Sequence, residues 1–172
     1  MSWFVAFPIT PVGWFDDLAP PPGLKREIAV DLHLTIAFFG GVSEASARKA
    51  FELTRAWPPA PAEAVMTALE PLGNPRHPSV IAATTHSADL VALMTHHRDA
   101  LYDAAEVPRD TRPPLAHVTI ARFGRRASKS ERAAGLAWAA KTKLEEARVK
   151  IAAVALYRSA PSAERKYEHT SD

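Results

Sequence analysis

The stretch at residues 33–40 reads HLTIAFFG, and the stretch at residues 117–124 reads HVTIARFG. The two agree at six of eight positions and lie 84 residues apart (117 − 33). Both are rich in Thr, Ile and Phe, which favour extended backbone with a half-buried face. We therefore expect two strands of one design that differ only at the second and sixth positions.

Alternation along a strand places a histidine and a threonine of each stretch on one face. His33 shares a face with Thr35, and His117 shares a face with Thr119. The apolar residues between them point the other way, into a core. If the two strands face each other across a cleft, two imidazoles and two hydroxyls converge on one site.

Such a set fits acid–base chemistry on a phosphoryl group. One imidazole takes a proton from water, the other gives a proton to the leaving oxygen, and two hydroxyls bind the non-bridging oxygens. With an ordinary pKa of about 6.5, histidine can play either part near neutral pH. The alternative is an internal duplication without chemistry, but two copies with matching apolar flanks favour the catalytic interpretation.

Length and composition limit the class of protein. At 172 residues and 47% apolar content, the chain can form one ordinary domain, or two small lobes that share a core. The absence of cysteine excludes disulfides and thiolate chemistry, and removes the ligands of most structural zinc sites. The N-terminal residues lack a basic region followed by a long apolar run, and no stretch approaches membrane-spanning length. We expect a cytoplasmic protein with no membrane contact.

The charge is nearly balanced overall but uneven along the chain. A net charge of +2, from 21 basic and 19 acidic residues, does not indicate a surface built to bind long nucleic acid. Residues 109–132, around the second stretch, hold seven basic and two acidic residues, an excess of five (7 − 2). This run is compatible with a solvated face or with substrate contact, and the pattern leaves both open.

The order of predicted elements indicates an α+β fold with mostly antiparallel pairing. Apolar and β-branched runs predict strands at 3–7, 33–39, 63–70, 79–84, 117–123 and 149–159. Capping residues and helical periodicity predict helices at 43–57, 87–104 and 128–143. The proline-rich segment 8–30 is expected to be mostly loop, and the polar tail 160–172 to be frayed apart from Tyr167.

On its two H-x-T segments, LHLTIAFFG and HVTIAR, the chain resembles the two-histidine (2H) phosphoesterases. Among these it is most similar to the bacterial RNA 2′,3′-cyclic phosphodiesterases, once called 2′-5′ RNA ligases. WFVAF near the N-terminus, and Leu156, Ser159 and Tyr167 near the C-terminus, are similar to the ends of the family's domain. The resemblance implies one domain over residues 1–172, made of two interleaved lobes that each contribute one H-x-T-x motif. It implies a bilobal α+β fold with pseudo-twofold symmetry, mostly antiparallel sheets around a central cleft, and helices outside.

The resemblance also implies an activity, which is hydrolysis of a ribose 2′,3′-cyclic phosphate to a 2′-phosphate. It makes His117 the base that activates water and His33 the acid that protonates the departing 3′ oxygen, with Thr35 and Thr119 holding the phosphate. The expected substrates are RNA ends or nucleotides that carry the cyclic phosphate. No metal, no cofactor and no obligate protein partner are expected, and we predict a monomer.

Two other functions stay open. The same site allows the reverse reaction, which joins RNA ends through a 2′-5′ bond, although the high concentration of water favours hydrolysis. A non-catalytic module that binds RNA ends is the third possibility. Two complete H-x-T sets argue against it, because pure binding does not need two titratable groups.

The sixth position of the repeat holds Phe38 in one copy and Arg122 in the other. Strict alternation would direct both away from the cleft. The family uses this position for substrate contact, which implies a bulge or twist after the threonine. We interpret Phe38 as a stacking surface for a base and Arg122 as a phosphate clamp, with core Phe and surface Arg as the alternative. Phe7 and Phe39 are further, weaker stacking candidates, and for both of them a place in the core is the favoured alternative.

Overall fold

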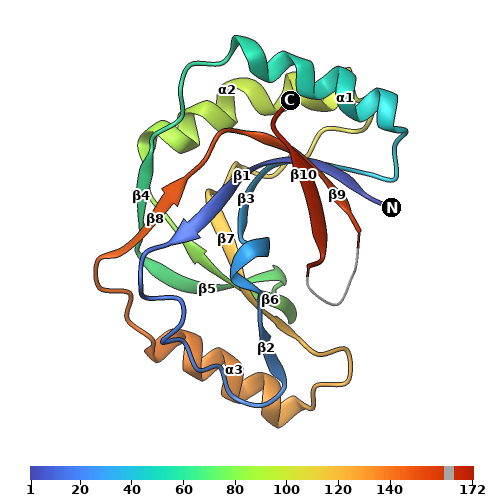
Figure 1. The fold of residues 1–172 in the computed structure, drawn as a ribbon. Coiled ribbons are helices and arrows are strands. Elements are labelled where there is room, and N and C mark those ends of the chain that lie inside the picture. The colour runs from blue at the N-terminus through green and yellow to red at the C-terminus, as the bar shows by residue number, and fades with distance from the viewer. Residues whose placement is uncertain (161–164) are drawn as a thin grey trace.

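The computed structural model describes residues 1–160 and 165–172, and in these residues the strands form two antiparallel sheets (Figure 1). The first sheet contains β1 (Trp3–Pro11), β3 (His33–Gly40), β4 (Glu63–Met66), β8 (Ala147–Ile151), β9 (Ala155–Ser159) and β10 (Tyr167–Thr170). The second contains β2 (Leu24–Arg26), β5 (Ala68–Asn74), β6 (His77–Thr84) and β7 (His117–Phe123). The helices are α1 (Glu44–Glu52), α2 (Ala88–Ala104) and α3 (Lys129–Lys141), with short 3-10 turns η1 (Ala29–Asp31) and η2 (Leu53–Ala56). The predicted α+β class with antiparallel sheets is confirmed.

The two repeated strands belong to different sheets but contact each other. In the first sheet, β3 pairs with one edge of β1, while β9 and β8 pair with successive halves of its other edge. In the second sheet the strand order is β2-β7-β6-β5. Because β3 also contacts β7, the two sheets meet along the two repeats.

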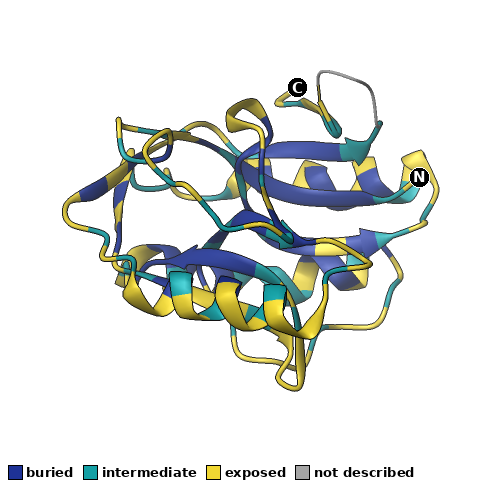
Figure 2. Ribbon diagram, turned by 90° about the horizontal axis from the view of Figure 1, so that it is seen from below, coloured by how far each residue is buried: buried dark blue, intermediate teal, exposed yellow. Residues whose placement is uncertain are grey.

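The helices lie outside the sheets, as expected. α1 contacts β1 and β9, α2 contacts β3, and α3 contacts β2 and β5. Figure 1 accordingly shows α1 and α2 at one end of the molecule and α3 at the other. Figure 2 shows buried strands inside and exposed helical faces turned outward. No helix in the described part of the chain has the length and apolar character needed to cross a membrane.

The apolar backs of the two repeats form the centre of the core. Leu34 and Ile36 of β3 and Val118 and Ile120 of β7 are at most 2% exposed. All four belong to one apolar cluster that draws residues from both sheets. Removing this much apolar surface from water anchors both strands, so the opposite faces, which carry the histidines, are held in place.

Two expectations about the elements are wrong in part. The segment 8–30 is mostly loop, as expected, although it also contains the end of β1, all of β2 and part of η1. The predicted strand 149–159 is two strands, β8 and β9, which pair with different halves of β1. The predicted strand 63–70 is also divided, since β4 joins the first sheet and β5 the second. Local propensity does not encode these divisions, because pairing partners far along the chain decide them.

The polar tail is more ordered than its composition indicates. Tyr167–Thr170 forms β10, which pairs antiparallel with β9, so these residues are not frayed. The part of the predicted tail at residues 161–164 lies outside the described residues.

Candidate active site

Both repeated strands carry the same irregularity after the threonine. The register of β3 with β1 skips Ile36, and the register of β7 with β6 skips Ile120. Each skipped residue and its successor are buried together, Ile36 with Ala37 and Ile120 with Ala121. A β-bulge of this kind moves the side-chain alternation by one residue. The predicted bulge is therefore confirmed in both copies.

The bulges return the sixth position of each repeat to the face of the histidine and threonine. Phe38 is 54% exposed and lines a cavity with His33 and Thr35. Arg122 lines the same cavity, together with Thr119 of the second repeat. The alternative in which Phe38 is a core residue is therefore wrong. Phe38 and Arg122 are both accessible to a ligand in the cavity.

Two adjoining cavities lie between the sheets. The first, of about 350 Å³, has the lining residues Ser2, Phe4, His33, Thr35, Phe38, Thr119, Arg122, Ser159 and Tyr167. The second, of about 450 Å³, lies beside His117 and shares Thr35 and Phe38 with the first. The structure therefore places the residues of both H-x-T pairs, from strands 84 residues apart in sequence (117 − 33), on two cavities that share the walls formed by Thr35 and Phe38.

The two imidazoles are oriented by the same backbone contact. Nδ1 of His33 donates to the carbonyl oxygen of Asp31 at 2.6 Å, and Nδ1 of His117 donates to that of Leu115 at 2.7 Å. A carbonyl can only accept a hydrogen bond, so Nδ1 must carry the hydrogen in each ring. Nε2 is then the atom that accepts a proton when the ring is neutral and donates a proton when the ring is charged.

The surroundings of His33 combine an apolar cage with nearby charges. Its ring centroid lies 5.0 Å from that of Phe4, 5.2 Å from that of Tyr157 and 5.0 Å from that of Tyr167. Burial lowers the pKa of His33, and the positive charge of Arg122 lowers it further. The hydrogen bond to the carbonyl of Asp31 and the nearby carboxylates oppose this lowering.

His117 has different neighbours. Burial lowers its pKa as well, with opposition from the carbonyl of Leu115 and reinforcement from the charge of Arg112. Among the described residues, no carboxylate acts to raise the pKa of this imidazole. The electrostatic surroundings therefore favour the neutral form more one-sidedly at His117 than at His33.

Arg122 is anchored by a residue that the sequence analysis missed. Its Nε donates to Oε1 of Glu27 at 2.5 Å. In the described part of the chain, its Nη1 and Nη2 atoms have no hydrogen-bond partner, so the planar end of the guanidinium is available to an anion. Glu27 lies in the segment expected to be loop, where no periodicity or motif distinguishes it.

The basic run at 109–132 contributes only in part to the two cavities. Arg109 pairs with Asp99 and Asp103, away from both cavities. Arg112, which pairs with Asp110, and Arg122 are the members of the run that line a cavity in the described structure. The run is therefore partly a solvated, paired surface and partly a wall of the candidate site.

Phe7 is wrong as a stacking candidate. It is 2% exposed and pairs across the strands with Leu34, so it lies on the apolar back of the sheet. Phe4, three residues earlier on β1, lies on the opposite face by the regular alternation of the strand. Phe4, not Phe7, is the aromatic residue of the first strand that reaches His33.

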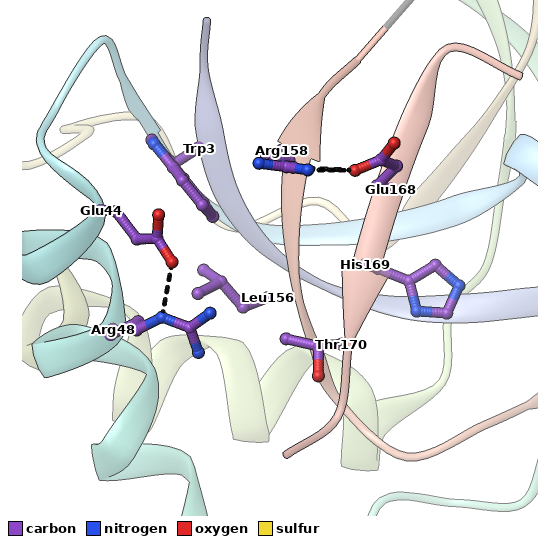
Figure 3. A pocket seen from close by; sticks show the side chains of 8 residues that line it. All are labelled: Trp3, Glu44, Arg48, Leu156, Arg158, Glu168, His169 and Thr170. Atoms are coloured by element: carbon purple, nitrogen blue, oxygen red, sulfur yellow. Dashed lines mark hydrogen bonds and ion pairs between the residues drawn. The ribbon is translucent and has the colours of Figure 1, made fainter.

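Another hollow, of about 240 Å³, is drawn in Figure 3 and has a different character. It lies where Trp3 and Leu156 meet α1 and β10. Its charged side chains are paired with each other, Arg48 with Glu44, and Arg158 with Glu168 (Figure 3). None of the described residues lining it comes from β3 or β7, so it is separate from the repeated motifs.

The residues around the cleft do not form a recognisable metal site. In residues 1–160 and 165–172, no group of three or more histidine or acidic side chains is placed to hold a metal ion. That activity needs no added metal stays a prediction.

The fold is shared with several solved structures over nearly the whole chain. TT0787 of Thermus thermophilus is 21% identical, with a TM-score of 0.68 over 99% of this chain and 94% of that one. E. coli LigT in complex with ATP is 18% identical, with a TM-score of 0.66 over 98% and 93%. A structure described as a phosphoesterase is 21% identical, with a TM-score of 0.65 over 98% and 93%. These likenesses confirm the predicted fold. No protein-family model and no curated protein sequence matches the chain.

Proposed function

We propose that this protein hydrolyses ribose 2′,3′-cyclic phosphates, on RNA ends or nucleotides, to 2′-phosphates. The observation that carries the proposal is the pair of histidines with equivalent Nδ1 contacts, which line two adjoining cavities together with two threonines and Arg122. The fold supports a nucleotide substrate, since E. coli LigT has been solved with ATP, with NADP+ and with 3′-AMP.

In this proposal His117 is the base. Burial and Arg112 keep its pKa low, so the ring is neutral near pH 7 and Nε2 can accept a proton. Nε2 takes a proton from water while the water oxygen bonds to phosphorus. The hydrogen bond from Nδ1 to the carbonyl of Leu115 strengthens as the ring gains positive charge.

His33 is the acid. Its Nε2–H gives a proton to the 3′ oxygen as the bond between phosphorus and that oxygen breaks, which leaves a 2′-phosphate and a 3′-hydroxyl. Burial and the charge of Arg122 lower the pKa of this ring, and the carboxylates of Glu27 and Asp31 oppose that lowering. A bound phosphate diester adds negative charge, which favours the protonated ring further. The two histidines exchange protons with solvent before the next cycle.

The remaining residues hold the substrate. The hydroxyls of Thr35 and Thr119 and the guanidinium of Arg122 bind non-bridging phosphate oxygens, whose charge grows in the transition state. Phe38, exposed at the junction of the two cavities, provides a flat apolar surface for a base.

One observation favours a second candidate function, ligation through a 2′-5′ bond. The cavity beside His117 measures about 450 Å³, which exceeds the space that a single attacking water needs. A second nucleoside in this cavity would place its 5′-hydroxyl where the water attacks. The same two imidazoles would then join the ends, by microscopic reversibility.

The decisive experiment is product analysis with purified protein. Adenosine 2′,3′-cyclic phosphate and an RNA ending in a cyclic phosphate are incubated with the enzyme, with and without EDTA, and ³¹P NMR distinguishes the 2′- from the 3′-phosphate. We expect the 2′-phosphate at equal rates in both buffers. A 3′-phosphate product, or RNA binding without turnover, contradicts the proposal. Adding RNA with a 5′-hydroxyl and testing for a 2′-5′ linkage checks the second candidate.

A further inference from the structure

Glu27 is a buried carboxylate in the proline-rich segment between the first strand and the first H-x-T motif. It is 7% exposed, and its backbone N–H donates to the carbonyl of Ile120 at 2.8 Å, directly beside the bulge of β7. A carboxylate removed from water is costly unless it is paired and hydrogen-bonded. The groups that bind the carboxylate of Glu27 therefore indicate what this residue does.

Both oxygens of Glu27 bind cations from other segments. Oε1 accepts from Nε of Arg122 on β7, and Oε2 accepts from Nζ of Lys166 just before β10, both at 2.5 Å. The carboxylate of Glu27 thus joins its own segment to two others, which lie 95 and 139 residues further along the sequence.

The contact with Glu27 leaves the end of the Arg122 guanidinium able to bind a phosphate. Because Glu27 binds only Nε, the guanidinium is fixed in direction while Nη1 and Nη2 have no hydrogen-bond partner among the described residues. Lys166 adds a second positive charge, so the three groups together carry a net charge of +1 (2 − 1). Glu27 therefore orients Arg122 without cancelling its attraction for an anion.

A neighbouring acid fastens the same segment to the other half of the site. Oδ2 of Asp31 accepts the backbone N–H of Lys166 at 2.9 Å, while the carbonyl of Asp31 accepts Nδ1 of His33. The next residue, Tyr167, stands edge-on to the ring of His33 and lines the cavity. Lys166 is thus held at both its backbone and its side chain, and Tyr167 is held with it.

We propose that Glu27 is a positioning residue, which holds Arg122 and Lys166 so that the guanidinium aimed at the phosphate and the wall formed by Tyr167 keep one arrangement. The identity of the phosphate as part of the substrate rests on the proposed function, but the positioning does not. Glu27 acts through Arg122 and Lys166 and need not touch the substrate.

The test compares Glu27→Gln with the matched control Glu168→Gln. The amide in Glu27→Gln keeps the size of the side chain and one oxygen acceptor, but loses the charge that two cations share. Glu168 pairs with Arg158 on the hollow of Figure 3, outside the cleft. We expect Glu27→Gln to lower kcat by about 10- to 100-fold with little change in KM, because a misplaced group loses transition-state contacts. Glu168→Gln should leave both constants unchanged.

A second measurement does not depend on turnover. The charged and titratable groups that face His33 are Glu27, Asp31, Arg122, Tyr157 and Tyr167. Loss of the Glu27 charge leaves the charge of Arg122 less balanced, so NMR titration should show the His33 ring protonating at lower pH in Glu27→Gln than in wild type. The control should titrate as wild type does.

The outcomes separate this inference from the proposed function. An unchanged kcat, or an unchanged His33 titration, in folded Glu27→Gln protein overturns the positioning role. If wild type shows no turnover, the proposed function fails, and the titration alone supports or overturns the role of Glu27. If Glu27→Gln does not fold, Lys166→Met tests the same cluster. Without Lys166, Glu27 neutralises Arg122 fully, so calorimetry should show several-fold weaker binding of inorganic phosphate, and unchanged binding overturns the inference.

Discussion

The half-site around His33 and the half-site around His117 share their backbone and differ in their neighbours. In each, Nδ1 donates to a carbonyl two residues earlier, a bulge follows the threonine, and an apolar back anchors the strand. His33 lies in a cage of aromatic rings close to Glu27 and Asp31, whereas His117 borders the larger cavity, close to Arg112.

This difference indicates how a duplicated motif can acquire two roles. The backbone contact makes both imidazoles competent for proton transfer through Nε2, and so does not distinguish them. Burial lowers the pKa of both rings. At His33 the charge of Arg122 adds to this lowering and the carboxylates of Glu27 and Asp31 oppose it, whereas at His117 the charge of Arg112 adds to it and no carboxylate of the described residues opposes it. The neighbouring charges, and not the backbone contact, are therefore what distinguishes the two halves.

The largest effect is expected from removal of either imidazole. General acid–base steps are each worth about 10² to 10⁴ in rate, so His33→Ala and His117→Ala should each lower kcat at least by about the smaller factor. Since both act in one step, the double variant should lose much less than the product of the two factors. Steady-state kinetics with adenosine 2′,3′-cyclic phosphate tests this, and a His117→Ala enzyme with near wild-type turnover would sink it.

A substrate with a good leaving group distinguishes the two histidines. The p-nitrophenolate of bis(p-nitrophenyl) phosphate departs without needing a proton, so the acid becomes dispensable while the base does not. We expect His33→Ala to recover most of its loss on this substrate, and His117→Ala to recover none. Equal losses would show that the two halves do not divide the roles in this way.

The threonines should matter less than the histidines and should matter equally. Thr35 and Thr119 each offer one hydroxyl at an equivalent place on the repeat. Loss of one hydrogen bond to the phosphate costs about 1 to 3 kcal/mol, so each Thr→Ala variant should lower kcat/KM accordingly. Thr→Ser variants should restore most of the activity. A Thr→Ala variant with unchanged kcat/KM would place that hydroxyl outside the phosphate site.

The sixth position of the repeat should show different functions in its two copies. Stacking of a base on an aromatic ring is worth about 1 to 3 kcal/mol. Phe38→Ala should therefore raise KM for adenosine 2′,3′-cyclic phosphate by the factor that corresponds to this loss of binding free energy. A ribose cyclic phosphate without a base serves as control and should be unaffected. Because Phe38 is 54% exposed, its loss should change the melting temperature little. An equal effect on both substrates would argue against stacking.

The smallest effect is a displaced pH profile. As pH falls, activity is lost when His117 takes up a proton, and Arg112 lowers the pKa of that ring. Arg112→Gln should therefore raise the pKa and move the acidic limb of kcat/KM to higher pH. Arg109→Gln, which alters a paired arginine away from the cavities, is the control and should leave the limb in place. A limb that does not move in Arg112→Gln would show that this charge does not reach His117.

Much of the site could be predicted because it is local. The period of a strand puts a histidine and the threonine two residues later on one face, and matching apolar flanks identify the buried side. The bulge was predictable from the family's use of the sixth position, and it places Phe38 and Arg122 as expected. Phe7 failed because alternation puts Phe4 and Phe7 on opposite faces of β1, and only the packing of β1 in the sheet decides which face turns toward His33.

What the sequence by itself determined is the repeated strand with its apolar back and its histidine–threonine front, because side-chain alternation needs no partner to be read. The tertiary structure alone decided that β8 and β9 share one edge of β1, and that Glu27 and Lys166 meet Arg122. These contacts join residues far apart in sequence whose individual propensities carry no sign of one another. Only packing of the two sheets brings a buried carboxylate within reach of both cations, and the cost of leaving it unpaired then holds the three together.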